Sequence, residues 1–307
     1  MSYINWYHGF DKSIEVKMAK QSVSNTALGA AICRLIEQYE PEETRLFSDP
    51  IVKDLVGAPI RLLMRSARMR NFTVRQTDAA ATGIYGAQIC RTRFIDDVIQ
   101  PALLEGIGQV VILGAGFDTR PYRLPGMERV IVFEVDLPAV QNNKKNRLKK
   151  HYGHLPKNVI FIPIDFDTQS LETILTSSAF DPSMPTLFIW EGVTQYVSEE
   201  AVCQTLSFIG KSAPTSIIVF TYVLKSIIER RSDIPDANKL MDIVDKHSPW
   251  IFGLEPSDIL AYLQSFHLAL QADVGDTFYQ EKYLQPIKRN LTVFKGERVV
   301  QAIVTRS

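Results

Sequence analysis

Residues 110–120 read VVILGAGFDTR, and this stretch decides how the rest of the chain is interpreted. Four apolar residues, typical of a buried strand, run directly into Gly114, Ala115 and Gly116. Two glycines one residue apart allow a tight strand-to-helix turn whose backbone can approach a ligand without interference from a Cβ atom. A dinucleotide-binding turn usually has a third glycine three residues later, and Thr119 occupies that position here. The stretch predicts a ligand-binding turn, with a purely structural turn as the alternative.

The charged residues that follow the turn indicate the charge of the ligand. Asp118 and Arg120 come directly after the glycines. A diphosphate would be poorly placed beside Asp118, because like charges repel. A ligand that carries an ammonium group would be better served by an acidic neighbour. The pattern therefore favours an amino-acid ligand over a dinucleotide.

Acidic residues also end the next apolar run. Residues 132–136 read VFEVD, about twenty residues beyond the glycine turn, where a carboxylate commonly accepts hydrogen bonds from ribose hydroxyls. Glu134 and Asp136 share a face of this predicted strand, because strand side chains alternate. Asp136 lies nearer the carboxyl end of the strand, where ligands of open α/β sheets bind. We expect Asp136 to contact the ribose, with Glu134 beside it, and a solvated loop acid is the alternative.

Two further motifs follow apolar runs later in the chain. Asp165 and Phe166 follow the third run, and an acid next to an aromatic residue suits an adenine ring. The alternative there is a helix cap at Asp167. Glu191 follows the fourth run in the string WEGVTQY, where a buried acid needs a partner and can hold a cationic ligand group.

The distribution of these runs predicts the fold class. Residues 1–105 have a helical pattern, including an amphipathic helix over 26–37, a second helix opened by Pro50, and a helix over 88–105 interrupted at Pro101. From residue 109 onward, short β-branched runs alternate with helical stretches, which indicates an α/β fold with a mostly parallel sheet. The expected strands are residues 109–113, 130–135, 159–162, 186–190, 216–221, 267–274 and 299–304. The last two strands could pair as an antiparallel hairpin at one side of the sheet.

We expect a helical N-terminal cover over residues 1–105 and a Rossmann-like core over 106–307. An insertion at about 223–255 follows the fifth strand, and a helix over 256–265 follows it. The whole is expected to be one integrated domain.

Composition excludes several classes of protein. The 307 residues carry 34 basic and 34 acidic side chains, so there is no global electrostatic attraction to nucleic acid or to an anionic membrane. Cys33, Cys90 and Cys203 are far apart and odd in number, which argues against disulfides and against a metal site. No apolar run is long enough to span a membrane, and the N-terminus lacks the apolar core of a secretory signal, so a cytoplasmic location is expected.

Several of these motifs, in their order and spacing, resemble a known family. The strings VVILGAGFDTRPYRLPG, VFEVDLPAV, DFD and PTLFIWEGVTQYVSEEAV are similar to the leucine carboxyl methyltransferase family, and in particular to its bacterial branch of O-methyltransferases. The N-terminal strings SVSNTALGAAICR, LFSDPIV and RTRFIDD also resemble that branch. The resemblance implies a class I methyltransferase fold, which is a seven-stranded, mostly parallel sheet with an antiparallel last strand.

The resemblance also implies a cofactor and the residues that hold it. The cofactor is S-adenosylmethionine, and the product is S-adenosylhomocysteine. Gly114 corresponds to the cofactor turn, Asp136 to the ribose contact, Asp165 and Phe166 to the adenine contact, and Glu191 to the methionine end. Arg91 matches the family arginine that pairs with the cofactor carboxylate. The candidate cofactor-binding residues are thus Arg91, Gly114, Gly116, Asp118, Glu134, Asp136, Asp165, Phe166 and Glu191.

The expected reaction is methyl transfer to a carboxylate or hydroxyl oxygen of a small-molecule acceptor. Tyr196 and Arg120 are candidates for contact with that acceptor, and Tyr222, Trp250 and Phe252 would suit an apolar one. No histidine lies in a recognisable motif, so the pattern assigns no catalytic base. Thr194 and Gln195 make this loop more polar than is usual in the family, which leaves the acceptor open.

Two other functions remain compatible with the pattern. A nicotinamide-dependent oxidoreductase also places an acid after its second strand, although the absent third glycine and the later acids favour a methyltransferase. A non-catalytic binding protein could retain the same fold. The sequence leaves the acceptor atom, the acceptor molecule and the oligomeric state undetermined.

Overall fold

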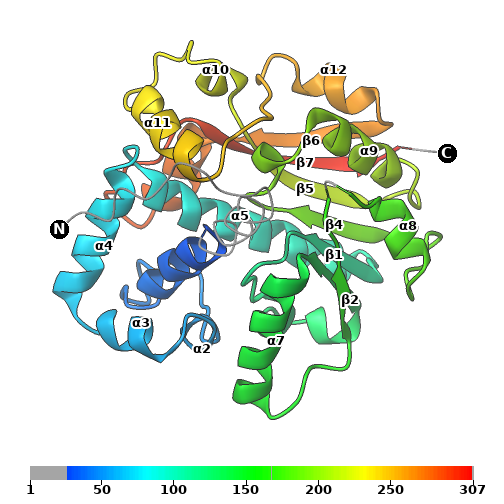
Figure 1. Ribbon diagram of the computed structural model, residues 1–307, viewed down its shortest axis with the longest axis horizontal. Helices are drawn as coiled ribbons and strands as arrows, with labels where there is room; N and C mark the ends of the chain where they lie inside the picture. The colour runs from blue at the N-terminus through cyan, green and yellow to red at the C-terminus, as the bar shows by residue number, and fades with distance from the viewer. Residues whose placement is uncertain (1–25, 167, 306–307) are drawn as a thin grey trace, which may run out of the picture.

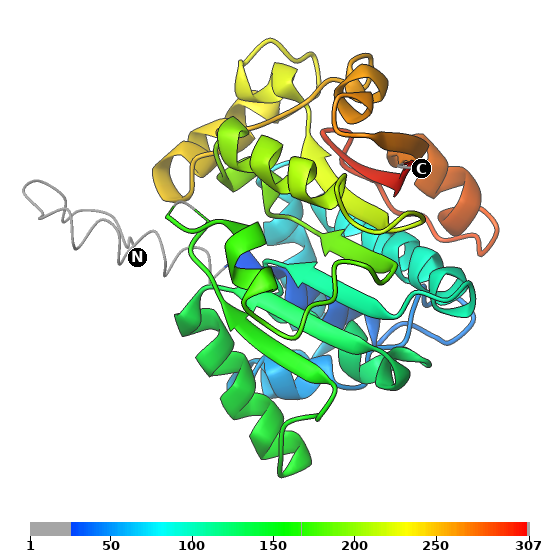
Figure 2. The same ribbon diagram turned by 90° about the vertical axis from the view of Figure 1, so that its right-hand side faces the viewer.

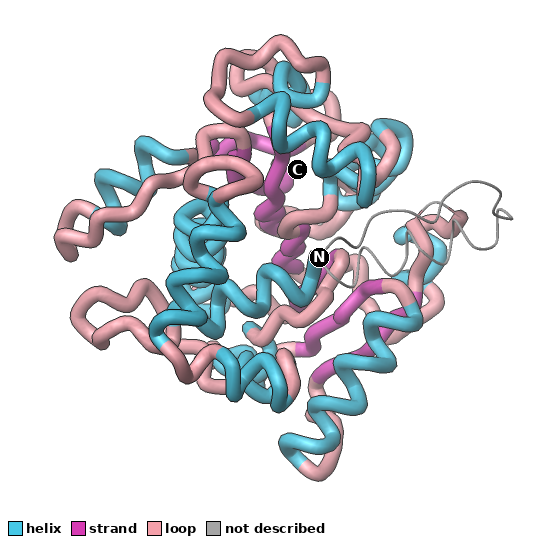
Figure 3. The backbone as a smooth tube through the Cα atoms, turned by 60° about the vertical axis from the view of Figure 1, so that its left-hand side comes forward, coloured by secondary structure: helices cyan, strands magenta, loops and turns pink. Residues whose placement is uncertain are grey.

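A seven-stranded sheet forms the centre of the molecule. The computed structural model describes residues 26–166 and 168–305, and the sheet order is β3-β2-β1-β4-β5-β7-β6. The strands are β1 (Gln109–Leu113), β2 (Ile131–Asp136), β3 (Val159–Pro163), β4 (Thr186–Trp190), β5 (Ile217–Val223), β6 (Leu268–Val274) and β7 (Glu297–Val304). The helices lie around this central run of strands (Figure 3).

The parallel part of the sheet confirms the predicted fold class. β1 to β5 pair in parallel, and every residue of β1, β4 and β5 is buried. Strands that are covered on both faces are expected to be continuous apolar runs, as these are. The predicted antiparallel pairing of the last two strands is also confirmed, and β7 lies between β5 and β6, antiparallel to both.

Helices cover both faces of the sheet (Figure 2). The N-terminal helices are an unlabelled helix over residues 26–37, α2 (Val52–Leu55), α3 (Ala58–Leu63), α4 (Ala67–Asp78) and α5 (Ile84–Leu104). The others are α6 (Arg120–Arg123), α7 (Pro138–Tyr152), α8 (Leu171–Thr176), α9 (Glu199–Ile209), α10 (Lys225–Ile228), α11 (Ala237–His247), α12 (Ile259–Gln264) and α13 (Asp276–Tyr279). Two short 3-10 helices are η1 (Met127–Arg129) and η2 (Thr194–Tyr196), and a short π-helix is η3 (Gln280–Leu284).

Alternation along the strands creates a separate apolar core on each face of the sheet. Val110 and Ile112 of β1 belong to the core that includes α5, whereas Val111 and Leu113 belong to the core that includes α8 and α9. α5 crosses the sheet near its middle (Figure 1). This long helix therefore connects the N-terminal helices to the strands that carry the predicted site.

Two helix boundaries differ from the predictions. α5 begins four residues earlier than expected and continues through Pro101. Pro101 is exposed and lies in the last turn, so the carbonyl that loses its intrahelical partner there can be hydrated. The second helix begins at Val52 rather than at Pro50, and the Asp49 carboxylate just before it accepts a hydrogen bond from the Val52 amide at 3.1 Å.

Smaller differences concern the other elements. The helix expected over residues 256–265 is the shorter α12, and β7 begins at Glu297, two residues before the expected start. The Asp167 cap lies outside the described residues. No helix in the described ranges is long and apolar enough to cross a membrane.

Candidate functional site

The predicted glycine turn lies at the edge of the sheet where β1, β2 and β4 end. Gly114 has a φ of 66°, in the left-handed region that favours glycine. A Cβ atom on Gly114 would lie 2.3 Å from Cγ2 of Val193, which is too close for any side chain. The turn therefore requires glycine at this position, because the β4 loop packs directly against its backbone.

A cavity of about 280 Å³ opens beside this turn. Its wall includes residues from the ends of β1, β2 and β5, the loops after β3 and β4, and the first residue of β7. The helix over residues 26–37 and α5 contribute the opposite wall. Such crevices at the carboxyl ends of strands are where open α/β folds bind ligands. Its volume is close to the lower end of the range for small-molecule sites.

Of the two acids on β2, Asp136 lies in the cavity wall. Asp136 lines the cavity and accepts hydrogen bonds from the backbone amides of Gly116 (2.5 Å) and Leu137 (2.6 Å). Burial raises the pKa of this carboxyl, and the two amide donors oppose the shift. The amides fix the carboxylate at the mouth of the glycine turn.

Glu134 has a different place from the one expected. It is fully buried and does not line the cavity. Its carboxylate pairs with the Lys144 ammonium at 2.8 Å and accepts a hydrogen bond from the Tyr122 hydroxyl at 2.6 Å. Both partners compensate a negative charge that burial would otherwise disfavour. Glu134 is therefore part of a buried ion pair and not, as expected, a residue of the cofactor site.

Asp165 and Phe166 both line the cavity near Asp136. Phe166 is half-buried and stacks on Trp190, with ring centroids 6.3 Å apart and planes 30° apart. Trp190, the last residue of β4, holds this ring in position. An aromatic face and a carboxylate are thus available together at this end of the cavity.

Two acids bind one buried arginine in the middle of the cavity. The Arg91 guanidinium of α5 donates to Glu191 at 2.8 Å and to Glu297 at 2.5 Å, and all three side chains line the cavity. Burial favours the neutral form of Glu191, but the Arg120 and Arg91 guanidiniums hold its pKa well below the usual range. No sequence motif indicates a role for Glu297, because this residue lies on β7, far along the chain from all the motifs.

Arg120 does not contact the cavity, which corrects its assignment as an acceptor-contact candidate. Only 2% of the residue is exposed, and its guanidinium pairs with Asp96 (2.8 Å), Asp118 (2.7 Å) and Glu191 (2.6 Å). Asp118 itself lines the cavity, and although burial opposes ionisation, Arg120 and Lys144 lower its pKa. Arg120 therefore holds two cavity acids in place and keeps them charged.

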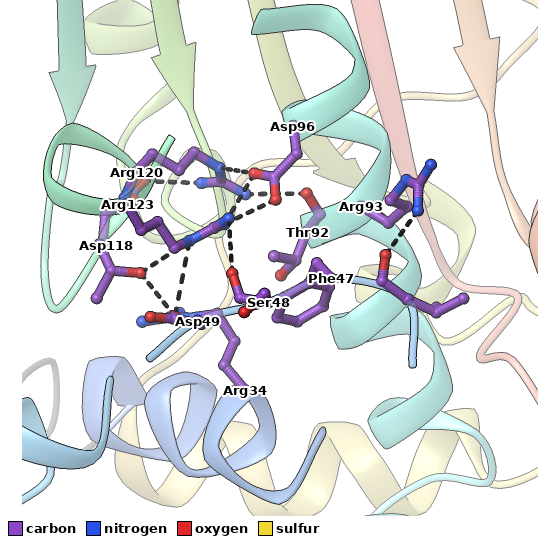
Figure 4. Close-up of polar contacts among 12 residues, drawn as sticks. Arg34, Phe47, Ser48, Asp49, Thr92, Arg93, Asp96, Asp118, Arg120 and Arg123 are labelled. Atoms are coloured by element: carbon purple, nitrogen blue, oxygen red, sulfur yellow. Dashed lines mark hydrogen bonds and ion pairs between the residues drawn. The ribbon is translucent and has the colours of Figure 1, made fainter. Parts of the chain in front are cut away.

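Further polar contacts link Arg120 and its partners to Arg123, Asp49 and Arg34 (Figure 4). Arg123 pairs with Asp96 at 2.7 Å, and Asp49 accepts hydrogen bonds from Thr119 (2.6 Å) and Arg34 (3.2 Å). Arg34, on the helix over residues 26–37, also lines the cavity. No sequence pattern predicts a cavity position for Arg34, because it reaches the cavity only when its helix packs against the glycine turn.

The other end of the cavity is mostly apolar. Tyr196 and Trp250 line the cavity. The Gln195 carbonyl accepts a hydrogen bond from the Ile251 amide at 2.8 Å, which attaches the segment that carries Trp250. Tyr222 and Phe252 do not line the cavity. Both are buried, and the Tyr222 hydroxyl bonds to Asp273.

The residues present fit an adenosyl ligand with an amino-acid end. Bare backbone at Gly116, an acid at the end of β2 and an aromatic face match a ribose and an adenine. The Arg91–Glu191 pair offers both charges that an amino-acid group requires. Within residues 26–166 and 168–305, no three His, Cys, Asp or Glu side chains come together in a group that could hold a metal ion.

The strand order and the site define a class I methyltransferase fold. A solved structure from Thermobifida fusca, named as a candidate methyltransferase, matches 83% of this chain and 94% of that chain with a TM-score of 0.54 and 14% identity. At that identity the likeness concerns the fold alone.

Sequence comparison identifies the family. The model of the leucine carboxyl methyltransferase family matches residues 27–210, and the chain belongs to this family. A Streptomyces coelicolor protein named as a candidate S-adenosyl-L-methionine-dependent methyltransferase is 32% identical over 67% of this chain and 71% of that protein. A similarly named protein from Mycobacterium sp. strain JLS is 33% identical over 72% of this chain and 85% of that protein.

Proposed function

We propose that this protein transfers a methyl group from S-adenosylmethionine to an oxygen atom of a small-molecule acceptor. The observation that carries the proposal is the single cavity shared by the Gly114 turn, Asp136, Phe166 and the Arg91–Glu191 pair. Family membership and the names of the relatives support the methyl donor. The oxygen acceptor and its small size belong to the proposal.

We assign the cofactor contacts as follows. Asp136 accepts hydrogen bonds from the ribose hydroxyls, Asp165 and Phe166 contact the adenine, and the backbone at Gly114 and Gly116 lies against the nucleoside. Arg91 pairs with the carboxylate of the methionine portion, while Glu191 and Asp118 face its cationic groups. When bound, the cofactor supplies a methyl group on a positively charged sulfur.

The charge of the cavity supports a cationic ligand. Among the described residues that line it, Arg34 and Arg91 are basic. Five are acidic, namely Asp118, Asp136, Asp165, Glu191 and Glu297. An excess of carboxylates in the cavity wall favours a sulfonium and disfavours the diphosphate of a dinucleotide. The chain's own contribution to the reaction is then to position the two reactants and to exclude water.

The size and lining of the cavity support a small acceptor. Ile84, Leu240, Trp250 and Phe294 contribute apolar parts of the cavity wall. A cavity of about 280 Å³ suits small organic molecules better than a folded partner.

Calorimetric titration tests the proposal. We expect the purified protein to bind S-adenosylhomocysteine and not NAD. Asp136→Ala should weaken S-adenosylhomocysteine binding at least tenfold, which is about 1.4 kcal/mol. Asp233→Ala, an exposed acid outside the cavity, should leave the affinity unchanged and is the matched control.

Binding of NAD without binding of S-adenosylhomocysteine would overturn the proposal and favour an oxidoreductase. Methyl transfer is then measured as release of S-adenosylhomocysteine over a panel of carboxylate and hydroxyl compounds. Tight cofactor binding with no turnover across the panel would favour a non-catalytic role.

A further inference from the structure

Strand β7 brings an unassigned carboxylate into the cavity wall beside Arg91. Because β7 runs antiparallel to β5, its first residue, Glu297, pairs with Val223 at the carboxyl end of β5. Glu297 Oε1 accepts a hydrogen bond from Arg91 at 2.5 Å. Oε2 has no hydrogen-bond partner among the residues that the structure describes, and the side chain lines the cavity. One carboxylate oxygen is thus fixed and the other is available to a ligand.

The charges around Glu297 bear on the chemistry of the acceptor. The two basic residues in the described cavity wall are already engaged. Arg34 pairs with Asp49 and donates to the Phe117 carbonyl, whereas Arg91 pairs with Glu191 and Glu297 and is the residue assigned above to the carboxylate of the cofactor. Among the described residues, a carboxylate acceptor beside Glu297 would find no guanidinium left to receive it. Burying such an uncompensated charge is costly.

A neutral hydroxyl has the opposite relation to this site. It can donate a hydrogen bond to Oε2 of Glu297, and the rest of its molecule can contact the apolar walls formed by Ile84, Leu240 and Phe294. Trp250 also lines this cavity, and its buried indole Nε1 has no hydrogen-bond partner. An acceptor with a second oxygen would satisfy that donor, because buried donors are normally paired.

We infer that the acceptor is a neutral alcohol or phenol on a largely apolar molecule, and that Glu297 receives its hydroxyl proton. The inference rests on the proposed function. As the proton moves to Oε2, the acceptor oxygen forms a bond to the methyl carbon. The carbon–sulfur bond breaks with its electron pair left on sulfur, giving the methyl ether and neutral S-adenosylhomocysteine. Glu297 then releases the proton to solvent. A base in this position typically contributes 10²–10⁴-fold to the rate.

A binding experiment with matched probes separates the two acceptor chemistries without requiring turnover. 1-Naphthol and 1-naphthoate have similar shape and differ in charge, and each is titrated into the protein saturated with S-adenosylhomocysteine. We expect 1-naphthol to bind at least tenfold more tightly. Glu297→Gln should reduce that preference by removing the repelling charge, whereas Glu281→Gln, an exposed acid outside the cavity, should preserve it.

Tighter binding of 1-naphthoate, or binding of neither probe, would overturn the inference. Failure of the unmodified protein to bind S-adenosylhomocysteine would instead contradict the proposed function. The two failures are therefore distinguishable.

Kinetics test the role of Glu297 as a base. With a hydroxyl acceptor from the panel, Glu297→Gln should lower kcat by 10²–10⁴-fold, and its residual rate should rise with pH as the acceptor ionises unaided. Affinity for S-adenosylhomocysteine should change much less than kcat. A panel that returns carboxylate acceptors alone, or an unchanged kcat in Glu297→Gln, would show the inference to be wrong.

Discussion

At the scale of single residues, two arginines that the sequence predicted for the site occupy different environments. Arg120 belongs to the most distinctive string of the chain, yet it is buried among Asp96, Asp118 and Glu191. Arg91 lies in the middle of a long helix, yet it lines the cavity. Both bind Glu191, so this carboxylate joins an arginine of the buried cluster to an arginine of the cavity wall.

The charge of Glu191 should appear in the pH dependence of stability. Its pKa in the folded protein lies below the unfolded value of about 4.3, so its contribution is present above about pH 5 and is lost as the pH falls. We expect Glu191→Gln to lower the free energy of unfolding by about 3–5 kcal/mol at pH 7. That difference should shrink toward pH 3.5.

Urea unfolding at pH 7, 5 and 3.5 measures this difference. Glu281→Gln, an exposed acid, serves as a control and should show little difference at any pH. A difference between unmodified protein and Glu191→Gln that stayed constant, or grew, on acidification would contradict the assigned direction of the pKa shift.

At the scale of elements, the turn after β1 shows how local backbone and distant packing act together. The glycine pattern in the sequence is explained by the left-handed backbone conformation of Gly114. The contact with Val193 comes from the loop after β4, which lies beside β1 in the sheet. The turn is therefore held on one side by its own conformation and on the other by a neighbouring strand.

Gly114→Ala should affect both stability and binding. A non-glycine residue in the left-handed region costs about 1–2 kcal/mol, and the added methyl group would also displace Val193. We expect a lower Tm and at least a tenfold weaker affinity for S-adenosylhomocysteine. Differential scanning fluorimetry and calorimetric titration measure the two effects.

Gly153→Ala is the matched control for this change. Gly153 also has a positive φ, of 80°, but a Cβ there would meet no atom within 4 Å. It should lower the Tm through backbone strain alone and leave the affinity unchanged. Equal losses of affinity in both variants would mean that the contact between Gly114 and Val193 does not shape the site.

At the scale of the whole molecule, ion pairs join the N-terminal helices to the rest of the chain. Arg289 pairs with Glu37 at 2.5 Å, and the Tyr283 hydroxyl donates to Asp97 at 2.9 Å. Arg34 donates to the Phe117 carbonyl at 2.5 Å, beside the glycine turn. These contacts connect the helix over residues 26–37 and α5 to both the core and the C-terminal segment.

We propose that the N-terminal cover and the methyltransferase core fold as one unit. Differential scanning calorimetry of the full chain should then show one transition whose calorimetric and van't Hoff enthalpies agree. S-adenosylhomocysteine at about 100 times its Kd should stabilise the folded state by about 2.7 kcal/mol and raise the single Tm.

Arg289→Ala should shift that transition without splitting it. An earlier, separate transition of the N-terminal helices would contradict the proposal of one cooperative unit.

The sequence by itself determined the strands, the glycine turn, and the placement of Asp136, Asp165, Phe166 and Glu191 at one edge of the sheet. These features follow from local patterns, because β-branched runs and glycines report backbone conformation. Parallel strands then bring their carboxyl ends together whatever lies between them.

Only the tertiary structure decided which charged residues lie in the cavity and which support it. Glu134 and Arg120 belong to a buried ion cluster, while Glu297 and Arg34 lie in the cavity wall. Arg91 and Glu297 are 206 positions apart in the chain and meet because β7 inserts antiparallel beside β5. A charged side chain finds its partner through the folded arrangement of distant elements, and no local pattern carries that information.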